Sequence, residues 1–221
     1  MSTLPAMRVG VLGSGEVGRA LARGFADRGH DVLIGSRGQA SEELATWLEG
    51  PGAGVKAGTF AETAGHGELV VLAVLGLAVE SAIEGAGPER FSGKVVIDAT
   101  NPLDFSQGFP PSLGWANTDS GGEHVQRAIP DAKVVKAFNT IGNAYFVEPH
   151  FTEGAPTMLV AGDDEEAKIL IGKAIVDFGW PAPVDVGGIE GSRWLEQLAV
   201  LWVAIGGKRG AWDHGFKLLV G

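Results

Sequence analysis

The sequence predicts an α/β protein built on a doubly wound parallel sheet. Apolar runs suited to buried strands alternate with helical patterns along most of the chain. Residues 69–74 are continuously apolar, which is typical of a parallel strand that is buried on both faces. Residues 7–37 indicate a strand, a glycine turn, a helix and a second strand, with Gly-x-Gly-x-x-Gly at the first corner. Together these features predict a Rossmann-type sheet.

The turn at residues 13–18 is typical of a site for the pyrophosphate of a dinucleotide. Gly13 allows the tight turn, Gly15 lets the backbone approach a pyrophosphate, and Gly18 lets the helix pack closely on the sheet. The helix that starts here offers free N–H groups and a partial positive charge to phosphates. A plain tight turn is the alternative, but the position between a strand and a helix favours the dinucleotide.

The end of the second strand indicates which dinucleotide the site prefers. An NAD site usually places Asp or Glu there to accept hydrogen bonds from the ribose hydroxyls. This strand ends in Gly35, Ser36 and Arg37, whereas Asp31 precedes it. A guanidinium matches the oxygens of a 2′-phosphate. The sequence therefore predicts NADP rather than NAD, and the alternative for Arg37 is a solvated surface charge.

The remaining elements follow from apolar spacing and from capping residues. Thr59 and Glu62 predict a capping box at the start of a short helix. Asp163 and Glu166 predict a cap rather than a metal site, because acidic residues favour a helix N-terminus. Further helices are expected over residues 42–49, 77–84, 123–129 and 192–205, and further strands over 55–57, 69–74, 94–99, 133–138, 156–161 and 184–186.

Polar residues directly follow two of the predicted strands. Ligands of open α/β sheets bind beyond the carboxyl ends of the strands, and four ends converge here: the glycine turn and residues 74–76, 100–102 and 139–141. Asn101, Asn139 and Ile141 are therefore expected near the nicotinamide or its hydride acceptor. A cap on a backbone turn is the alternative for both asparagines. Asp98 is expected to bond a neighbouring loop, and no side chain stands out as a firm catalytic acid, base or nucleophile.

Two further features concern the organisation of the chain. Residues 103–122 are rich in Gly, Pro, Ser and aromatic residues, and such a long loop predicts a lid over the cofactor. A domain boundary is expected near residues 149–155. The expected domains are residues 1–150, which bind NADP, and residues 151–221, a small C-terminal α/β domain that closes the cofactor crevice.

The composition excludes several classes of site and partner. The chain has no cysteine, and its five histidines show no metal-ligand spacing, so neither a disulfide nor a metal site is expected. A net charge of −10 argues against binding to nucleic acid or anionic membranes. Without a signal peptide or an apolar run near the roughly 20 residues that span a bilayer, a cytoplasmic protein is expected. Trp194 and Trp202 are expected in the core or in a dimer contact.

The chain resembles the NADP-dependent oxidoreductases of the deazaflavin coenzyme F420. The matching stretches are residues 9–18, 29–37, 134–141 and 160–164 and the helix start Ser192-Arg193-x-x-Glu196-x-Leu198. The resemblance implies a Rossmann domain, a small C-terminal domain and a homodimer. The chain departs from the family pattern at Asn139, where some members carry histidine, and after Arg37, where some carry another basic residue.

The resemblance also implies roles for residues around the strand ends. Ser14, Glu16 and Val17 would line the pyrophosphate, and Ser36 and Arg37 would hold the 2′-phosphate. The region that would border the nicotinamide and the deazaflavin comprises Val74, Leu75, Asn101, Pro102, Asn139 and Asn143.

We therefore expect an oxidoreductase that transfers a hydride between NADP(H) and a deazaflavin or another small, flat redox acceptor. Such a reaction needs two rings held in contact and little side-chain chemistry. One alternative is an NADPH-dependent reductase of a carbonyl, an imine or a free flavin, with His124 or Tyr145 as candidates for the proton donor. The other is a non-catalytic regulatory module that binds NADPH.

Overall fold

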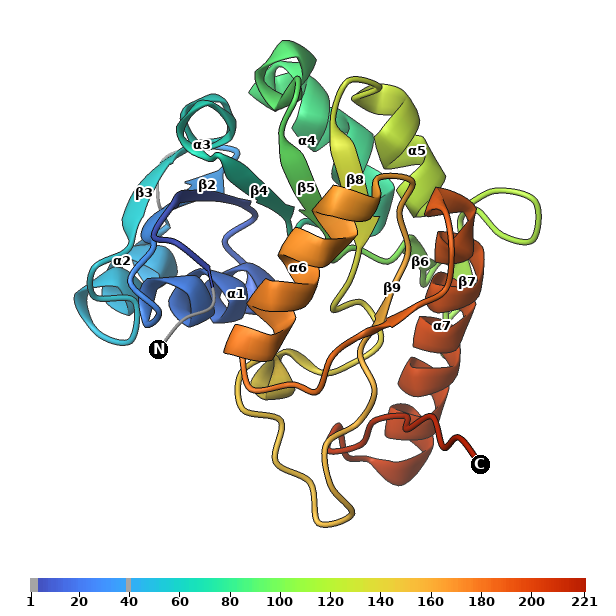
Figure 1. Ribbon diagram of the computed structural model, residues 1–221. Coiled ribbons are helices and arrows are strands. Elements are labelled where there is room, and N and C mark those ends of the chain that lie inside the picture. Colours follow the sequence, from blue (N-terminus) through green and yellow to red (C-terminus); the bar gives the residue numbers. More distant parts are fainter. Residues whose placement is uncertain (1–3, 39–40) are drawn as a thin grey trace.

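A computed structural model gives the structure of the chain and describes residues 4–38 and 41–221. A parallel sheet with the strand order β3-β2-β1-β4-β5-β8 forms its centre (Figure 1). The prediction of a doubly wound, Rossmann-type sheet is confirmed. The strands of this sheet are β1 (Arg8–Leu12), β2 (Asp31–Ser36), β3 (Lys56–Thr59), β4 (Leu69–Leu72), β5 (Val95–Asp98) and β8 (Lys133–Lys136).

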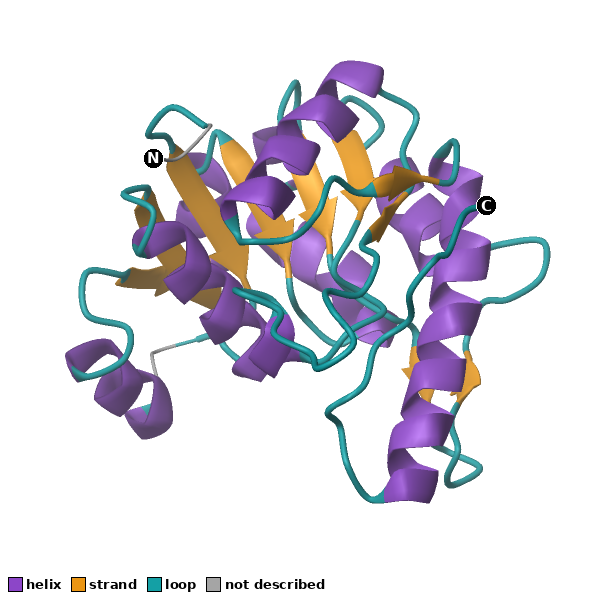
Figure 2. Ribbon diagram, turned by 60° about the horizontal axis from the view of Figure 1, so that its bottom comes forward, coloured by secondary structure: helices purple, strands orange, loops and turns teal. Residues whose placement is uncertain are grey.

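Helices cover both faces of the sheet (Figure 2). Side chains alternate across a strand, so Leu69 and Val71 enter one core and Val70 and Leu72 enter the other. The first core receives α1 (Glu16–Ala26), α2 (Glu42–Glu49) and α6 (Glu165–Asp177). The second core receives α3 (Phe60–His66), α4 (Val79–Ala86) and α5 (Gly121–Ala128). The seventh helix, α7 (Ser192–Arg209), stands beside the β8 edge of the sheet (Figure 1).

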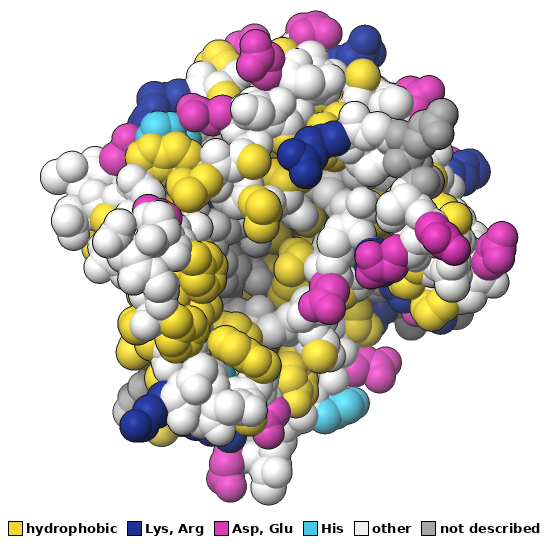
Figure 3. All heavy atoms as spheres, turned by 180° about the vertical axis from the view of Figure 1, so that it is seen from behind, with side chains coloured by type: hydrophobic (Ala, Val, Ile, Leu, Met, Phe, Trp, Pro, Cys, Tyr) yellow, Lys and Arg dark blue, Asp and Glu magenta, His cyan; other side chains and the backbone are white. Residues whose placement is uncertain are grey.

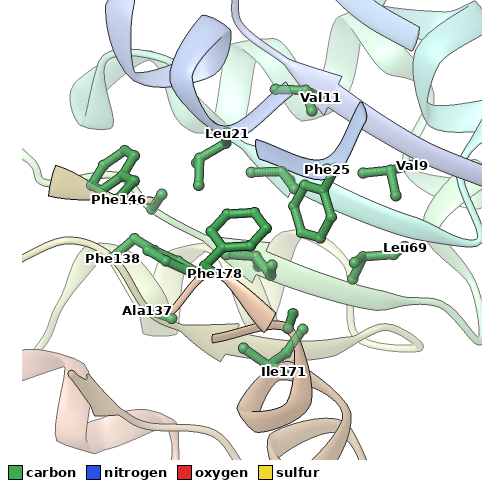
Figure 4. Close-up of a cluster of buried hydrophobic side chains, with 14 of the residues drawn as sticks. Val9, Val11, Leu21, Phe25, Leu69, Ala137, Phe138, Phe146, Ile171 and Phe178 are labelled. Atoms are coloured by element: carbon green, nitrogen blue, oxygen red, sulfur yellow. The ribbon is translucent and has the colours of Figure 1, made fainter. Parts of the chain in front are cut away.

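Aromatic rings join distant parts of the chain in the first core (Figure 4). The ring centroids of Phe25 and Phe178 lie 4.9 Å apart, and those of Phe138 and Phe146 lie 5.5 Å apart. Because Phe25 belongs to α1 and Phe178 follows α6, this core spans the expected boundary near residue 150. The division into domains at that position stays a prediction.

The predicted lid segment is not an irregular loop throughout. Residues 103–122 contain a short hairpin in which β6 (Leu103–Asp104) pairs antiparallel with β7 (Ser112–Leu113). The ring of Phe109 in the hairpin packs on α7 at Gly207. A Cβ atom at Gly207 would lie only 2.1 Å from that ring, so the contact requires glycine there. These strands were not predicted from the sequence, because two residues are too few to show an alternating apolar pattern.

The C-terminal part adds two short strands, and the N-cap of its first helix, α6, differs from the prediction. The strand β9 (Leu159–Val160) pairs with β10 (Val184–Asp185), and Ala161 bridges Lys136 of β8. The cap of α6 is Asp164, whose carboxylate accepts a hydrogen bond from the N–H of Ala167 at 2.8 Å. The prediction that Asp163 is this cap is wrong, because its carboxylate accepts the N–H of Ile189 instead.

Two further findings concern individual helices. The capping box of Thr59 and Glu62 is confirmed at the start of α3. Across residues 4–38 and 41–221, no helix has both the length and the apolar character that crossing a bilayer requires.

Candidate functional site

The glycine turn is shaped by two positions without side chains. Gly13 has a φ angle of 119°, and its N–H donates a hydrogen bond to the carbonyl of Gly35 at 3.0 Å. A Cβ atom at Gly13 would lie 2.3 Å from the carbonyl oxygen of Ala73. A Cβ atom at Gly18 would lie 1.8 Å from the carbonyl oxygen of Gly13. Gly18 therefore lets α1 approach the turn itself, and both glycines hold the end of β1 against that of β4.

The middle glycine of the motif differs from the other two because it faces open space. Gly15 is the N-cap of α1, and a Cβ atom there would meet nothing within 4 Å. Among the described residues, no side chain caps the first turn of α1. Glu16 is exposed and Val17 is half-buried at this end, and the carbonyl of Ser14 accepts a hydrogen bond from Arg19. The helix end thus leaves N–H groups free beside an open approach, as an anion site requires.

The end of β2 lies beside this turn. Leu12 and Gly35 are register partners in the β1–β2 pair, so Ser36 and Arg37 follow at the same edge of the sheet. Arg37 is exposed, and the hydroxyl of Ser36 donates to the carbonyl of Gly38 at 2.7 Å. Residues 39 and 40, which follow, lie outside the described residues. The arrangement leaves a guanidinium available to a phosphate near the glycine turn.

The ends of β4 and β5 also touch each other. A Cβ atom at Gly76 would lie 2.1 Å from the carbonyl oxygen of Asn101 and 2.5 Å from the nitrogen of Pro102. Val74 is half-buried beside this contact, while Leu75 is 80% exposed. The structure therefore brings the ends of β4 and β5 together, as the sequence predicted. The apolar side chains of Val74 and Leu75 follow the end of β4.

The two predicted asparagines bond to each other. Asn101 donates from Nδ2 to the main-chain carbonyl of Asn139 at 2.8 Å, and Asn139 donates from Nδ2 to Oδ1 of Asn101 at 2.9 Å. Asn139 is only 5% exposed, and within the described residues its Oδ1 has no hydrogen-bond partner. Phe138, which precedes it, has a φ angle of 62°, a rare backbone conformation for a bulky residue. The pair therefore leaves one buried acceptor without a partner among the described residues.

A buried ion cluster supports these strand ends, although no local sequence pattern predicted it. Lys136 Nζ lies 2.7 Å from Oδ2 of Asp98 and 2.8 Å from Oε1 of Glu196, and all three side chains are fully buried. Asp98 and Lys136 are register partners on β5 and β8. Charged residues at the ends of two apolar strands were the available signal for the pair, whereas Glu196 on α7 gave no such signal.

Hydrogen bonds connect this cluster to the loops on either side. Lys136 donates to the carbonyl of Thr100 at 2.9 Å, directly before Asn101. Glu196 accepts the N–H groups of Gly121 and Gly122 at the start of α5, at 2.9 and 3.0 Å. Burial alone lowers the pKa of Lys136, but the two carboxylates outweigh it and raise that pKa above its ordinary value. The ammonium therefore stays charged and holds three segments together.

The two candidates for a proton donor have partners of their own. His124 Nδ1 lies 3.0 Å from Oε1 of Glu80, its Nε2 lies 3.1 Å from Oδ2 of Asp119, and its ring stacks on Trp115. The ring of Tyr145 lies 4.5 Å from that of Phe151. Nothing in these contacts brings either side chain to the asparagine pair.

Figure 3 shows the molecule from behind, with a hollow on this face and hydrophobic side chains gathered along one side of it. In Figure 2 the strands end on the same side as the lower half of α7. A site that combines an open, uncapped helix end with apolar side chains suits a ligand that carries phosphates and flat rings.

Comparison with known proteins identifies similar chains. Residues 8–102 match the family described as NADP oxidoreductase coenzyme F420-dependent. The F420-dependent NADP reductase of Methanothermobacter marburgensis is 29% identical over 221 residues, which cover 96% of this chain and 98% of that protein.

Solved structures extend this likeness. A crystal structure from Arthrobacter sp. FB24, described as a proposed F420-dependent NADP-reductase, has a TM-score of 0.93 and 37% sequence identity, and the match covers 97% of this chain and 100% of that one. A reductive aminase from Aspergillus terreus has a TM-score of 0.65 at 20% identity, covering 93% of this chain and 63% of that one. The second likeness concerns the fold alone.

Proposed function

This chain belongs to the family of coenzyme F420-dependent NADP oxidoreductases, and we propose that it transfers a hydride between NADP(H) and a deazaflavin of the F420 type. The observation that supports the proposal most is the convergence of an open, uncapped helix end with the bonded asparagine pair at one edge of the sheet. The relatives named F420-dependent NADP reductase match over nearly their whole length, which supports the deazaflavin as the acceptor.

The residues of the glycine turn and of β2 are proposed to hold the cofactor. The free N–H groups at Gly15, Glu16 and Val17 bind the pyrophosphate, with Gly13, Ser14 and Gly18 shaping the turn. Ser36 and Arg37 bind the 2′-phosphate, because the exposed guanidinium lies at the adjacent strand end. These residues fit NADP. Gly15 has no Cβ atom to obstruct the pyrophosphate, and the exposed Arg37 offers a cation to the 2′-phosphate.

The other strand ends are proposed to orient the two rings. Bound NADPH supplies the hydride. The free Oδ1 of Asn139 accepts a hydrogen bond from the carboxamide N–H of the nicotinamide, and Asn101 holds Asn139 in place. The apolar side chains of Val74, Leu75 and Ile141 exclude water from the ring contact. Pro102 and Asn143 border the same space. Hydride transfer between stacked rings requires close contact rather than a side-chain acid or base.

We also propose a homodimer. Apolar side chains are exposed on α7, at Trp194 and Leu201. Others are exposed near the end of the chain, at Leu218, Leu219 and Val220. An exposed apolar surface of this kind marks an interaction site, and a second copy covers it in this proposal. Light scattering at micromolar concentration would give twice the chain mass, and Leu201→Glu would reduce it to one chain mass. A wild-type protein that stays monomeric would refute this part.

One experiment tests the reaction. The purified protein is mixed anaerobically with NADPH and oxidised coenzyme F420, and the loss of deazaflavin absorbance is followed, with NADH as the control. Rapid loss with NADPH and slow loss with NADH is the expected result. Binding of NADPH without any loss would refute the deazaflavin. It would favour reduction of a carbonyl, an imine or a free flavin, or a regulatory module.

A further inference from the structure

The chain beyond α7 turns back and packs against the end of β8. Gly210 ends α7 with a φ angle of 66°, and the following residues run back along the helix (Figure 2). The N–H of Thr157 donates to the carbonyl of Phe216 at 2.8 Å, and the N–H of Leu218 donates to the hydroxyl of Thr157 at 2.9 Å. The tail is therefore fixed in place rather than free.

This return path builds an aromatic cluster from Trp202, Trp212 and His214. The rings of Trp202 and His214 stack at 4.8 Å, and those of Trp202 and Trp212 lie 5.3 Å apart. Trp202 Nε1 donates to the carbonyl of His214 at 2.9 Å, and His214 Nε2 lies 3.0 Å from the carbonyl of Trp202. The ring of Trp212 packs over Gly206, where a Cβ atom would lie 2.3 Å from it.

The cluster lies against the loop that follows β8. A Cβ atom at Gly142 would lie 3.3 Å from Cζ2 of Trp202, and a Cβ atom at Gly215 would lie 3.0 Å from Cδ1 of Ile141. Ile141 is two residues beyond Asn139, the residue assigned above to the nicotinamide. The aromatic rings are therefore next to the place where a hydride acceptor must lie to reach the nicotinamide.

We propose that Trp202, Trp212 and His214 form the wall on which the ring of the hydride acceptor packs, so that the C-terminal tail selects a planar, conjugated acceptor. This proposal rests on the proposed hydride transfer. Trp212 is 49% exposed, so part of this residue is accessible to a ligand. Planar conjugated rings of different chemistry can all pack on an indole ring. His214 Nδ1 is buried without a hydrogen-bond partner among the described residues.

The test compares Trp212→Leu with Trp194→Leu. Trp194 is 60% exposed on the same α7 helix but takes no part in the cluster, so its loss is a matched control. Dissociation constants for oxidised F420 and for FMN are measured by spectroscopic titration without NADPH, and NADPH affinity and melting temperature are measured separately. W212L is expected to weaken binding of both planar acceptors about tenfold, with unchanged NADPH affinity and melting temperature. W194L, a change in the proposed dimer contact, is expected to leave the affinities for F420, FMN and NADPH unchanged.

The outcomes separate this proposal from the reaction itself. Unchanged acceptor affinity in folded W212L and in Trp202→Phe would overturn the proposal, even if NADPH reduces F420. A lower melting temperature together with equal losses for NADPH and acceptor would show that the cluster only anchors the tail, and would also overturn it. Weaker acceptor binding in W212L without any hydride transfer by the wild type would support the wall and refute the proposed reaction.

Discussion

The side-chain amide of Asn139 donates a hydrogen bond to Oδ1 of Asn101 at 2.9 Å. The two residues are 38 positions apart and follow the neighbouring strands β5 and β8. Each asparagine therefore fixes the other, and Asn101 also holds the main chain of Asn139. The pair organises the backbone between the two strand ends, and the expectation that it borders the nicotinamide stays a prediction.

Removing either member of the asparagine pair is expected to slow hydride transfer. Asn139→Ala removes the free acceptor, and Asn101→Ala releases Asn139 from its position, so each should lower kcat about 10- to 100-fold. Single-turnover measurements under saturating NADPH report this step. The double variant should be no slower than Asn139→Ala alone. Independent, multiplicative losses would contradict a role of Asn101 through Asn139.

Replacing Lys136 is expected to destabilise the fold. Lys136→Met leaves Asp98 and Glu196 buried without their cation, so the free energy of unfolding should fall by about 3–5 kcal/mol. Urea unfolding at neutral pH measures the change. Lys133→Met on the same strand is the control, because the Lys133 pair with Asp164 is partly exposed and should cost below about 1 kcal/mol. Equal effects of both variants would contradict the importance of burial.

The stability difference between wild type and Lys136→Met is also expected to depend on pH. The folded protein raises the pKa of Lys136, so its contribution is fully present below the unfolded value of about 10.5 and is lost as pH rises through the folded value. The difference in unfolding free energy between wild type and Lys136→Met should therefore be constant near neutral pH and shrink in strong alkali. A difference that already shrinks between neutral and mildly alkaline pH would contradict the direction of the shift.

Two glycines of the turn are expected to respond differently to alanine. Gly18→Ala forces a Cβ atom onto the carbonyl of Gly13 and should lower the free energy of unfolding by about 1–3 kcal/mol. Gly15→Ala meets open space, so stability should change by less than about 1 kcal/mol. NADPH binding should nevertheless weaken about tenfold in Gly15→Ala, since the Cβ atom blocks the approach of the pyrophosphate. Calorimetric titration of the folded variant decides whether this loss occurs.

Arg37 is expected to determine the preference for NADPH over NADH. Arg37→Ser removes the cation proposed for the 2′-phosphate, so the dissociation constant for NADPH should rise about 10- to 100-fold. Affinity for NADH, which lacks this phosphate, should stay the same. Arg23→Ser is the control, because Arg23 is an exposed arginine on α1 that pairs with Asp27, the residue that follows this helix. Parallel losses for both nucleotides in Arg37→Ser would refute the assignment.

Several parts of this protein can be predicted from local patterns of residues. The glycine turn required Gly13 and Gly18 at fixed spacing, and the continuous apolar run of β4 required two covered faces. The convergence of the strand ends followed as well, because parallel strands share one carboxyl edge. These features can be predicted because each arises from residues close together in the chain or from the rules of sheet topology.

Contacts between side chains far apart in the sequence could not be predicted in this way. Lys136 joins Asp98, 38 residues earlier, to Glu196, 60 residues later, and Trp202 reaches Gly142 because the tail turns back after Gly210. The choice of Asp164 over Asp163 as a cap likewise depended on Ile189, which takes the other carboxylate. Such contacts depend on strand register and on how whole elements dock, and these are set by packing across the complete core rather than by any local spacing.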